Sequence, residues 1–488
     1  MPFLHAGGRT SLAFFAALLT GGALLLAPVP AQAAPSQEAA VVRVLDRSAY
    51  PLRSTDPRSD LRDLRPLGRI VGDAGVVGVG EATHGSHEFF TNKHRIFRFL
   101  VENKGFSSFI QEVGWGSGLR LNDYVVRGTG NLRQIMREEF VNEYALWNNE
   151  EYYDLLQWMR AYNSTHRDKL HYVGDDVVYS HRRIFQEIFP YVRERRPGLL
   201  PRFRALYRGL IPVGDVKEWQ DRYDAQPLAV RQRLLRQAEQ ALALLRTLRR
   251  GPHDRAAAWA EQQAAVVVRI ARLSASDDPQ AIANSRERGM AENTAWWYRN
   301  MHSKSVLSAH NAHIGYVGFA GQHDIYRQGA RLRDMLGDRY TNFGLTFYQG
   351  SFNAWSAESG LQGPLQEFTV GPPPRVNSET LLDRVRYRDF YFDMRTIGQP
   401  ARGWLDRERP VRNIGGAYPQ EDDVLALRQA YDNLIHLHRV TASHLLPPAG
   451  DTVRAAAPSG SVPAGTAPRG VRRDHTAAGR AHVRPGTG

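Results

Sequence analysis

Short apolar runs that end in polar residues recur along this chain and predict the strands of a buried sheet. The first covers residues 76–79, and its brevity and β-branched side chains favour a strand over a helix. From about Glu88, apolar residues recur at helical spacing with basic residues between them, and Gly105 is a suitable end for this helix. A second strand is predicted over residues 106–112. Together the three elements have the length of a βαβ unit.

Two more runs, residues 170–173 and 306–309, end in the same way. In an open parallel sheet, the loops beyond the carboxyl ends of the strands converge, and ligands bind there. We therefore predict a mainly parallel central sheet flanked by helices, of the α/β class, with a site at one edge. The polar residues that follow the four runs are Glu81, His84, Glu112, Asp175, Asp176, His310, Asn311 and His313.

Composition restricts the chemistry that such a site can perform. The 488 residues include no cysteine, which excludes thiol nucleophiles, disulfides and thiolate metal sites. There is no G-x-S-x-G elbow and no H-E-x-x-H zinc signature. Residues 78–83 resemble the start of a dinucleotide fingerprint, but the third glycine is missing and Glu81 would face the pyrophosphate with like charge. What remains is histidine paired with carboxylate, which suits the activation of water.

Several segments resemble the erythromycin esterase family. They are GEATHGSHEFF at 80–90, the segment 105–112, YVGDD at 172–176, RERGMAEN at 286–293, AHNAH at 309–313, RNIG at 412–415, Tyr418 and YDNLI at 431–435. The likeness covers roughly residues 48–446. It implies an α/β core with a helical side domain, and a cleft in which water attacks an ester or macrolactone carbonyl without a covalent serine or cysteine nucleophile.

The resemblance also implies roles for individual residues. His84 matches the proposed general base, and Glu81 and Glu112 match the carboxylates held near it. His310 and His313 match the family's second histidine pair. Candidates for holding the substrate or its oxyanion are Lys93, Arg286 and Asp176, together with the same two histidines. Lys93 stands where the family often has arginine. An arginine could donate two parallel hydrogen bonds to a carboxylate or oxyanion, whereas the ammonium group of Lys93 acts as a single point charge.

Two alternatives stay open beside the hydrolase that needs no cofactor. Glu81-x-x-His84, completed by Glu112, Asp176, His310 and His313, would also suit a divalent metal, although this spacing falls in a predicted loop and not on a helix. In that case the chain would be a metal-dependent hydrolase of another ester or lactone. The second alternative is a family member that only binds a polar ligand and does not catalyse.

The N-terminal residues predict export. Arg9, an apolar run over residues 12–27 and the A-x-A sequence before Ala34 are typical of a cleaved secretory signal over residues 1–33. The apolar run is short for a membrane span. We therefore expect the mature protein to be secreted or extracytoplasmic. The absence of cysteine is in keeping with an exported bacterial enzyme.

The remaining chain predicts one large domain over residues 34–448 and a basic tail. The segment of about residues 184–273 is helical in character and broken by prolines, so we expect an inserted helical hairpin or lid that shapes specificity together with Trp147 and Trp219. Residues 449–488 are rich in Ala, Gly, Pro and Arg and should be disordered.

Charge adds little to the prediction of partners. The formal net charge is +13, but the basic residues of the domain are spread over helices and form no patch with interleaved aromatics, so nucleic-acid binding is not expected. The tail, with six Arg against two Asp, is expected to contact an anionic cell surface weakly. A small ester or macrolide substrate is the expected partner, and no obligate protein partner is evident.

Overall fold

The computed structural model describes residues 35–318, 324–360 and 363–447. The predicted signal peptide and the predicted tail lie outside the described residues. By its internal contacts the chain divides into residues 1–449 and 450–488, and the described residues all belong to the first unit. Within them, no helix combines the length and the apolar character that crossing a membrane requires.

A ten-stranded mixed sheet forms the centre of the fold. The strand order is β1-β8-β12-β6-β2-β5-β3-β4, with β7 and β10 also paired to β6. The six strands from β12 to β4 in this order are parallel, whereas β8 and β7 are antiparallel to their partners. The strands of this sheet are β1 (Tyr50–Pro51), β2 (Val76–Val79), β3 (Phe106–Gly114), β4 (His171–Asp176), β5 (Lys304–Ser308), β6 (Tyr340–Ser356), β7 (Leu365–Val370), β8 (Phe390–Asp393), β10 (Ala417–Tyr418) and β12 (Asn433–Val440). A separate two-stranded sheet pairs β9 (Arg409–Val411) with β11 (Asp423–Leu425).

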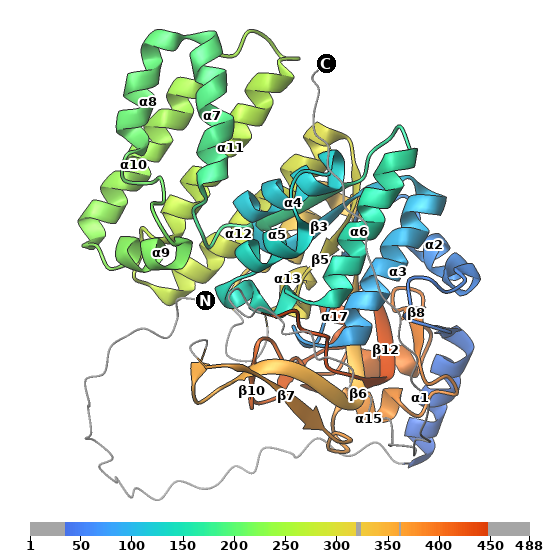
Figure 1. Ribbon diagram of the computed structural model, residues 1–488. Helices are drawn as coiled ribbons and strands as arrows, with labels where there is room; N and C mark the ends of the chain where they lie inside the picture. Colours follow the sequence, from blue (N-terminus) through green and yellow to red (C-terminus); the bar gives the residue numbers. More distant parts are fainter. Residues whose placement is uncertain (1–34, 319–323, 361–362, 448–488) are drawn as a thin grey trace, which may run out of the picture. The chain divides into compact units, whose positions relative to one another are not determined.

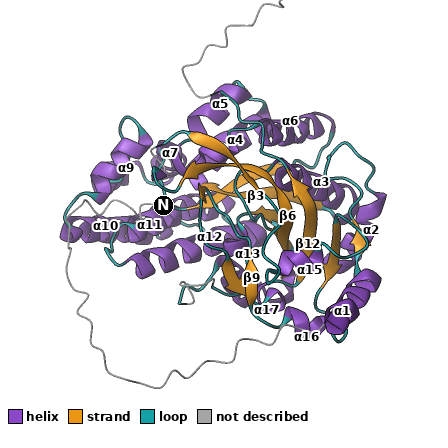
Figure 2. Cartoon of the chain, turned by 90° about the horizontal axis from the view of Figure 1, so that it is seen from below, coloured by secondary structure: helices purple, strands orange, loops and turns teal. Residues whose placement is uncertain are grey.

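Helices cover both faces of the sheet, with α3 and α6 on one side and α12 and α17 on the other (Figures 1 and 2). The α-helices outside the insertion are α1 (Pro35–Ser48), α2 (Arg65–Val71), α3 (His87–Lys104), α4 (Trp115–Arg127), α5 (Leu132–Glu139), α6 (Glu150–Thr165), α12 (Pro279–Met301), α13 (Asn311–Ile314), α14 (Gln328–Leu336), α15 (Ser378–Leu382), α16 (Ala401–Leu405) and α17 (Leu427–Ala430). Short 3-10 helices are η1 (Arg62–Leu64), η2 (Asn142–Trp147), η3 (Pro197–Leu199) and η4 (Gly337–Arg339).

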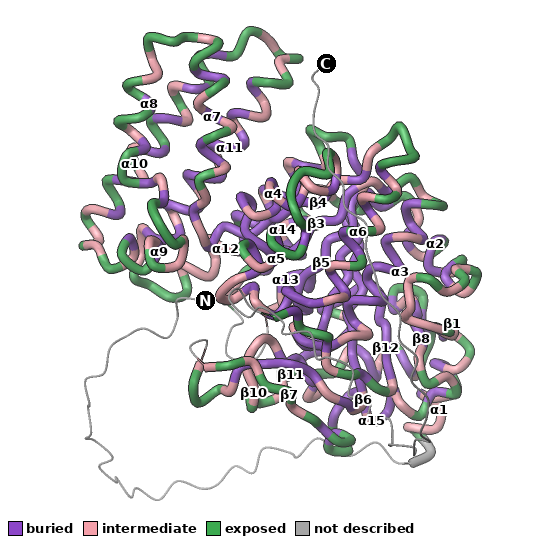
Figure 3. Tube along the Cα trace, in the orientation of Figure 1, coloured by how far each residue is buried: buried purple, intermediate pink, exposed green. Residues whose placement is uncertain are grey.

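The strands explain why two hydrophobic cores form. Successive side chains of a strand point to opposite faces of a sheet. Accordingly, Val77 and Phe109 join the core beneath α3 and α6, whereas Val76 and Ile110 join the core on the α12 side. Strands buried on both faces need continuous apolar runs, which is the pattern that predicted them. Figure 3 shows these strands as buried along most of their length.

Helices α7 to α11 form the insertion between β4 and α12. They are α7 (Arg182–Arg195), α8 (Leu200–Tyr207), α9 (Val216–Asp224), α10 (Leu228–Arg246) and α11 (Arg255–Leu273). Prolines lie at or just before the starts of three helical segments, at Pro197, Pro201 and Pro227, where a missing N–H costs little. The bundle packs against α4 and α12 beside the sheet (Figure 1). Its role as a lid stays a prediction.

The predicted α/β fold class is confirmed, and one feature of the topology was not foreseen. The chain predicts β2 and β3 as successive strands of a βαβ unit, but β5 lies between them in the sheet. Helix α3 therefore crosses over one intervening strand. The consequence is that β5 delivers His310 and His313 between the loop after β2 and the end of β3.

Candidate active site

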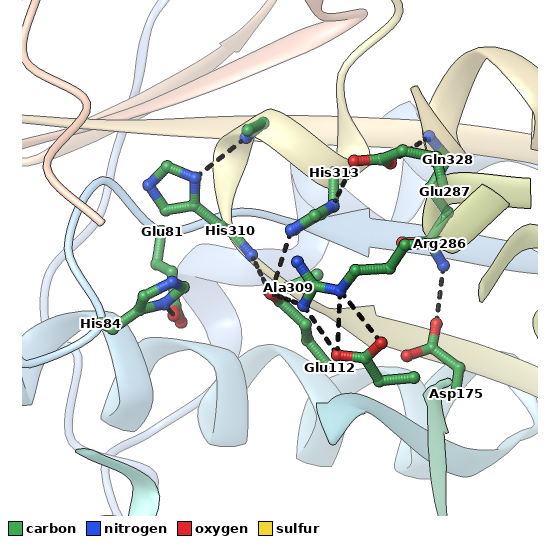
Figure 4. A network of polar contacts seen from close by, with 12 residues as sticks. Glu81, His84, Glu112, Asp175, Arg286, Glu287, Ala309, His310, His313 and Gln328 are labelled. Carbon is green, nitrogen blue, oxygen red and sulfur yellow. Dashed lines mark hydrogen bonds and ion pairs between the residues drawn. The ribbon is translucent and has the colours of Figure 1, made fainter. Parts of the chain in front are cut away.

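The carboxyl ends of β2, β3, β4 and β5 bring the predicted residues together (Figure 4). Glu81 and His84 lie in the loop after β2, and Glu112 lies near the end of β3. Asp176 ends β4. His310 caps the N-terminus of α13, and His313 lies within this short helix.

Two chain segments distant in sequence hold the loop that carries His84. The backbone N–H of His84 donates to the carbonyl of Gly415 over 3.2 Å, so the RNIG segment supports the loop. Gly85 packs directly on the main chain of Asn353, where an added Cβ would lie 1.9 Å from the carbonyl oxygen. Only glycine permits this approach. The loop is therefore fixed before any ligand binds.

Glu81 and His84 form a buried pair. Nδ1 of His84 lies 2.6 Å from Oε1 of Glu81, whose side chain is 1% exposed, while the His84 side chain is 16% exposed. Burial raises the pKa of Glu81, but the charge of Lys93 and the contact with His84 outweigh it and lower the pKa. The carboxylate thus stays ionised and holds the proton of His84 on Nδ1. Nε2 then carries a free lone pair that can accept a proton.

Lys93 is the second partner of the Glu81 carboxylate. Its ammonium group donates to Oε2 of Glu81 and lies 3.4 Å from the carbonyl oxygen of Ala309. The side chain is 1% exposed. Sequence reasoning placed Lys93 among the groups that hold substrate or oxyanion, whereas the contacts of the described residues engage it with the carboxylate partner of His84. A lysine suffices here because the contact with Glu81 uses one donor.

Glu112 is the centre of a second network. Its Oε2 accepts a hydrogen bond of 2.9 Å from the backbone N–H of His310. Its Oε1 lies 3.0 Å from Nε2 of His313 and accepts a 3.0 Å hydrogen bond from Arg286. Burial raises the pKa of Glu112, but His313, His84 and Arg286 hold the pKa well below its usual range. Glu112 therefore remains charged and links β3 to β5 and α12.

Arg286 and Asp176 extend this network. Arg286 donates from Nη2 to Asp176 over 2.7 Å and from Nε to both oxygens of the same carboxylate over 3.1 and 3.3 Å. The hydroxyl of Tyr144 donates to Asp176 over 3.0 Å. Sequence reasoning placed both residues among the groups that hold the substrate, and in the structure they bind each other. Arg286 has two buried carboxylates for partners, so it is already neutralised.

Asp175, the neighbour of Asp176, faces the other side of β4. Its Oδ2 accepts hydrogen bonds from Thr294 over 2.9 Å and from Gln328 over 2.6 Å. Burial, followed by the charge of Asp176, raises the pKa of Asp175 well above its usual value. Because side chains alternate along a strand, Asp176 joins the network of Glu112 and Arg286, and Asp175 ties β4 to α12 and α14.

His313 is held as a cation between two glutamates. Nε2 lies 3.0 Å from Glu112, and Nδ1 lies 2.8 Å from Oε1 of Glu287. Burial lowers the pKa of His313, but the charges of both glutamates outweigh it and raise the pKa to about 10. Sequence reasoning missed Glu287. The sequence signal that could have indicated Glu287 was its position directly after Arg286 in the RERGMAEN segment.

His310 has the opposite character. Its Nδ1 accepts the backbone N–H of Ala312 over 3.3 Å, and its buried Nε2 has no hydrogen-bond partner among the described residues. Burial, and next the charge of His84, lower the pKa of His310 well below its usual range. The ring is therefore neutral, with its proton on Nε2. Its centroid lies 4.9 Å from that of His84, so the two rings are neighbours.

The two tryptophans expected to shape specificity lie in different surroundings. Trp147, in η2, packs edge-on against the ring of His84 with a centroid separation of 5.4 Å. Trp219 stacks on Tyr223 within α9 at 5.1 Å. Trp147 is thus the one that contacts the site directly.

The contacts of Glu81 bear on the metal alternative. Both of its oxygens are engaged, one by His84 and one by Lys93. In the ranges that the structure describes, the one cluster of three histidine, aspartate or glutamate residues with converging ligand atoms lies elsewhere, at His87, Glu151 and His444. A metal at this site would therefore have to displace His84 or Lys93 from Glu81.

The fold and the site define an α/β protein with a buried histidine–carboxylate pair at the carboxyl ends of its parallel strands. The family model described as Erythromycin esterase matches residues 101–440, and the chain belongs to the erythromycin esterase family of hydrolases. Glu112, Arg286, His310 and His313 fall within the matched segment, while Glu81 and His84 precede it.

Relatives agree with this assignment. Erythromycin esterase type II of Escherichia coli is 24% identical over 328 residues, which cover 62% of this chain and 75% of the relative. The putative hydrolase YbfO of Bacillus subtilis (strain 168) is 21% identical over 424 residues, or 82% of this chain and 91% of the relative.

Solved structures share the fold. A protein from Bacillus cereus matches with a TM-score of 0.77 and 27% identity, covering 84% of this chain and 99% of that one. A succinoglycan biosynthesis protein matches with a TM-score of 0.75, the same identity and the same coverage. A mutant of the erythromycin esterase EreC in its open conformation matches with a TM-score of 0.62 and 17% identity, covering 80% of this chain and 98% of that one. The last likeness concerns the fold alone.

Proposed function

We propose that this chain hydrolyses the ester bond of a macrolactone or a related ester, with water activated by His84. One observation carries the proposal: the ring of His84, whose Nδ1 is fixed by Glu81 at 2.6 Å, lies 4.9 Å from the ring of His310, whose Nε2 has no hydrogen-bond partner among the described residues. A base and a donor placed side by side suit the attack of water on a carbonyl group.

The reaction then follows from the two histidines. His84 takes a proton from water as its oxygen attacks the carbonyl carbon, and the Nε2–H of His310 donates to the oxygen on which negative charge develops. The ionised Glu81 stabilises the protonated ring of His84. His84 next returns the proton to the leaving alkoxide oxygen as the carbon–oxygen bond breaks. The products are a carboxylic acid and an alcohol, joined in one open chain when the substrate is a lactone.

The second network serves to position these groups. Glu112 accepts the backbone N–H of His310, and its charge is balanced by His313 and Arg286. Asp176 in turn orients Arg286. We assign these residues the task of fixing β5 and α13, so that His310 faces His84.

A macrolide is the proposed substrate because the Escherichia coli relative is an erythromycin esterase. Trp147, which packs against the ring of His84, is the aromatic side chain that we expect to influence binding of such a ligand. The insertion of helices α7 to α11 is the proposed determinant of specificity. We also propose that the enzyme is exported, which N-terminal sequencing of protein recovered from culture medium would test.

The first experiment compares the protein lacking residues 1–33 with its H84N variant on a 14-membered macrolide. An asparagine amide can replace Nδ1 as donor to Glu81 but supplies no base at Nε2. We expect mass spectrometry to show the addition of one water by the wild type, and a loss of roughly 10²- to 10⁴-fold in rate for H84N. H166N, at an exposed position after α6, is the matched control.

Three results would contradict the proposal. Hydrolysis by H84N at the wild-type rate would remove His84 from the chemistry. Loss of hydrolysis in the wild type after treatment with EDTA, restored by a divalent ion, would favour the metal-dependent alternative. Binding of the macrolide without turnover by well-folded wild type would favour the non-catalytic alternative.

A further inference from the structure

A second cluster of histidines and a carboxylate lies outside the proposed catalytic site. His87 is the first residue of α3, and Glu151 is the second residue of α6. His444 follows β12 near the end of the described chain. Helices α3 and α6 lie side by side (Figure 1), so their N-terminal ends bring His87 and Glu151 together.

The ligand atoms of this cluster converge. Oε1 of Glu151 lies 2.6 Å from Nδ1 of His87 and 2.8 Å from Nδ1 of His444. The two rings stand nearly perpendicular, with centroids 5.1 Å apart. The three ligand atoms all lie within 4.8 Å of one another. Two imidazole nitrogens and one carboxylate oxygen in such an arrangement form a ligand set typical of zinc.

The second carboxylate oxygen of Glu151 independently indicates a ligand at this cluster. The side chain of Glu151 is 2% exposed, and its Oε2 is buried without a hydrogen-bond partner among the described residues. A buried carboxylate oxygen without a partner is unfavourable, because it has lost its water and gained nothing in return. His87 and His444 are 32% and 67% exposed, so an ion can enter from solvent.

The backbone around the cluster is held by contacts that do not involve these three side chains as ligands. The N–H of His87 donates to the carbonyl of Thr441 over 2.8 Å, and the N–H of Glu150 donates to the carbonyl of His444 over 2.9 Å. Isolated β-bridges join Ser86 to Ala442 and Asn149 to Leu445. The three ligands are thus presented on a prepared frame, which reduces the ordering that an ion would otherwise have to impose.

We propose that His87, Glu151 and His444 bind a divalent transition-metal ion, with Zn²⁺ as the best match. On binding, the proton of each ring moves from Nδ1 to Nε2, and the two hydrogen bonds from the rings to Oε1 are replaced by bonds to the metal. The backbone N–H of His444, which donates to the same oxygen over 3.1 Å, can stay in place. Glu151 can then use both oxygens. Three protein ligands leave a coordination position for water. The ion ties the segment after β12 to the N-terminal ends of α3 and α6.

The inference goes beyond the proposed hydrolysis and does not depend on it. His84 and Trp147, which contact each other, lie three and four residues before His87 and Glu151. A metal at the cluster would join these two segments, but the proposed reaction at His84 does not require it.

The test uses the protein without a histidine tag, stripped of metal and dialysed against Zn²⁺. Metal analysis by mass spectrometry is expected to find one tightly held equivalent in the wild type. H444A and E151Q are expected to weaken binding of this equivalent at least tenfold. H84N is the matched control, because it removes a histidine from the proposed catalytic site and should retain the ion. Co²⁺ in place of Zn²⁺ should give visible absorption in the wild type and in H84N but not in H444A.

H444A keeps the test decisive if E151Q fails to fold, because the His444 side chain is largely exposed. Zn²⁺ is expected to raise the midpoint of thermal unfolding by roughly 2 to 5 °C in the wild type and not in H444A. Equal binding by H444A and the wild type would overturn the proposal, as would a wild type that retains no ion. Loss of the ion in H84N with retention in H444A would assign the metal to the catalytic edge and overturn it equally.

Discussion

Two halves of the candidate site use the same side-chain types for opposite purposes. The open half consists of Glu81, His84 and His310, and Nε2 of each histidine has no hydrogen-bond partner among the described residues. The closed half consists of Glu112, Asp176, Arg286, Glu287 and His313, where both nitrogens of His313 face carboxylates. His310 and His313 are three residues apart, both are buried, and the pKa shifts in opposite directions. The number of carboxylates around each ring decides whether it is a neutral donor or a fixed cation.

This contrast teaches that a histidine in a predicted site is not sufficient evidence for a catalytic role. A histidine with both nitrogens engaged stabilises the arrangement, and one with a free nitrogen can transfer a proton or donate to substrate. The closed half has its charges balanced internally, which permits a dense group of ionised side chains at a buried edge. The open half depends on that rigidity for the approach of His310 to His84.

The largest effect on stability is expected from E112Q, which removes a charge from the centre of the closed half. His313 and Arg286 would each lose a charged partner while buried, so we expect a loss of about 3 to 5 kcal/mol in the free energy of unfolding. Urea denaturation measures this loss. E102Q is the matched control, because Glu102 pairs with Arg98 at 41% exposure, and its loss should stay below about 1 kcal/mol. Similar values for both variants would contradict the closed half as a structural unit.

A smaller effect, confined to rate, is expected from substitutions of His310. H310A removes the donor of the open half, and we expect kcat on the ester substrate to fall by roughly 10²- to 10³-fold. H310Q should retain more of the rate than H310A, since a glutamine amide N–H can replace the donor at Nε2. Steady-state kinetics on both variants tests the order. Equal losses in the two variants would contradict a donor role for Nε2.

A further effect is a dependence of stability on pH that comes from His313. Its pKa is raised to about 10 in the folded protein and is about 6.5 when unfolded, so the stabilisation is fully present below pH 6.5. It is lost as the pH rises through 10. Between pH 6.5 and pH 10, the folded state binds one more proton at His313 than the unfolded state does. The contribution of this group to the free energy of unfolding therefore falls by about 1.4 kcal/mol per pH unit.

The measurement for this prediction is the free energy of unfolding of the wild type and of H313Q between pH 6 and pH 10. The difference between the two proteins should shrink as the pH rises. A difference that is constant over the range would show that His313 is not held as a cation.

The sequence predicted the elements that carry the candidate site well, and the neighbouring elements less well. The strands β2 to β5 could be predicted because buried parallel strands require apolar runs. The end of α3 at Gly105 could be predicted because a left-handed cap favours glycine. The long strand β6 and the placement of β5 between β2 and β3 were not predicted. Strand order depends on which faces pack together across hundreds of residues, and no local pattern records it.

By itself, the sequence determined which chemistry is available: no thiol, no serine elbow, and histidines and carboxylates at the ends of apolar strands. It also carried the segments that assign the chain to its family. Only the tertiary structure decided the state of each group. Lys93 belongs to Glu81, Arg286 to Asp176 and Glu112, and the two histidines of one short helix differ in charge. The reason is physical: the ionisation of a buried side chain depends on the charges and donors within a few ångströms, and folding alone brings these together from distant parts of the chain.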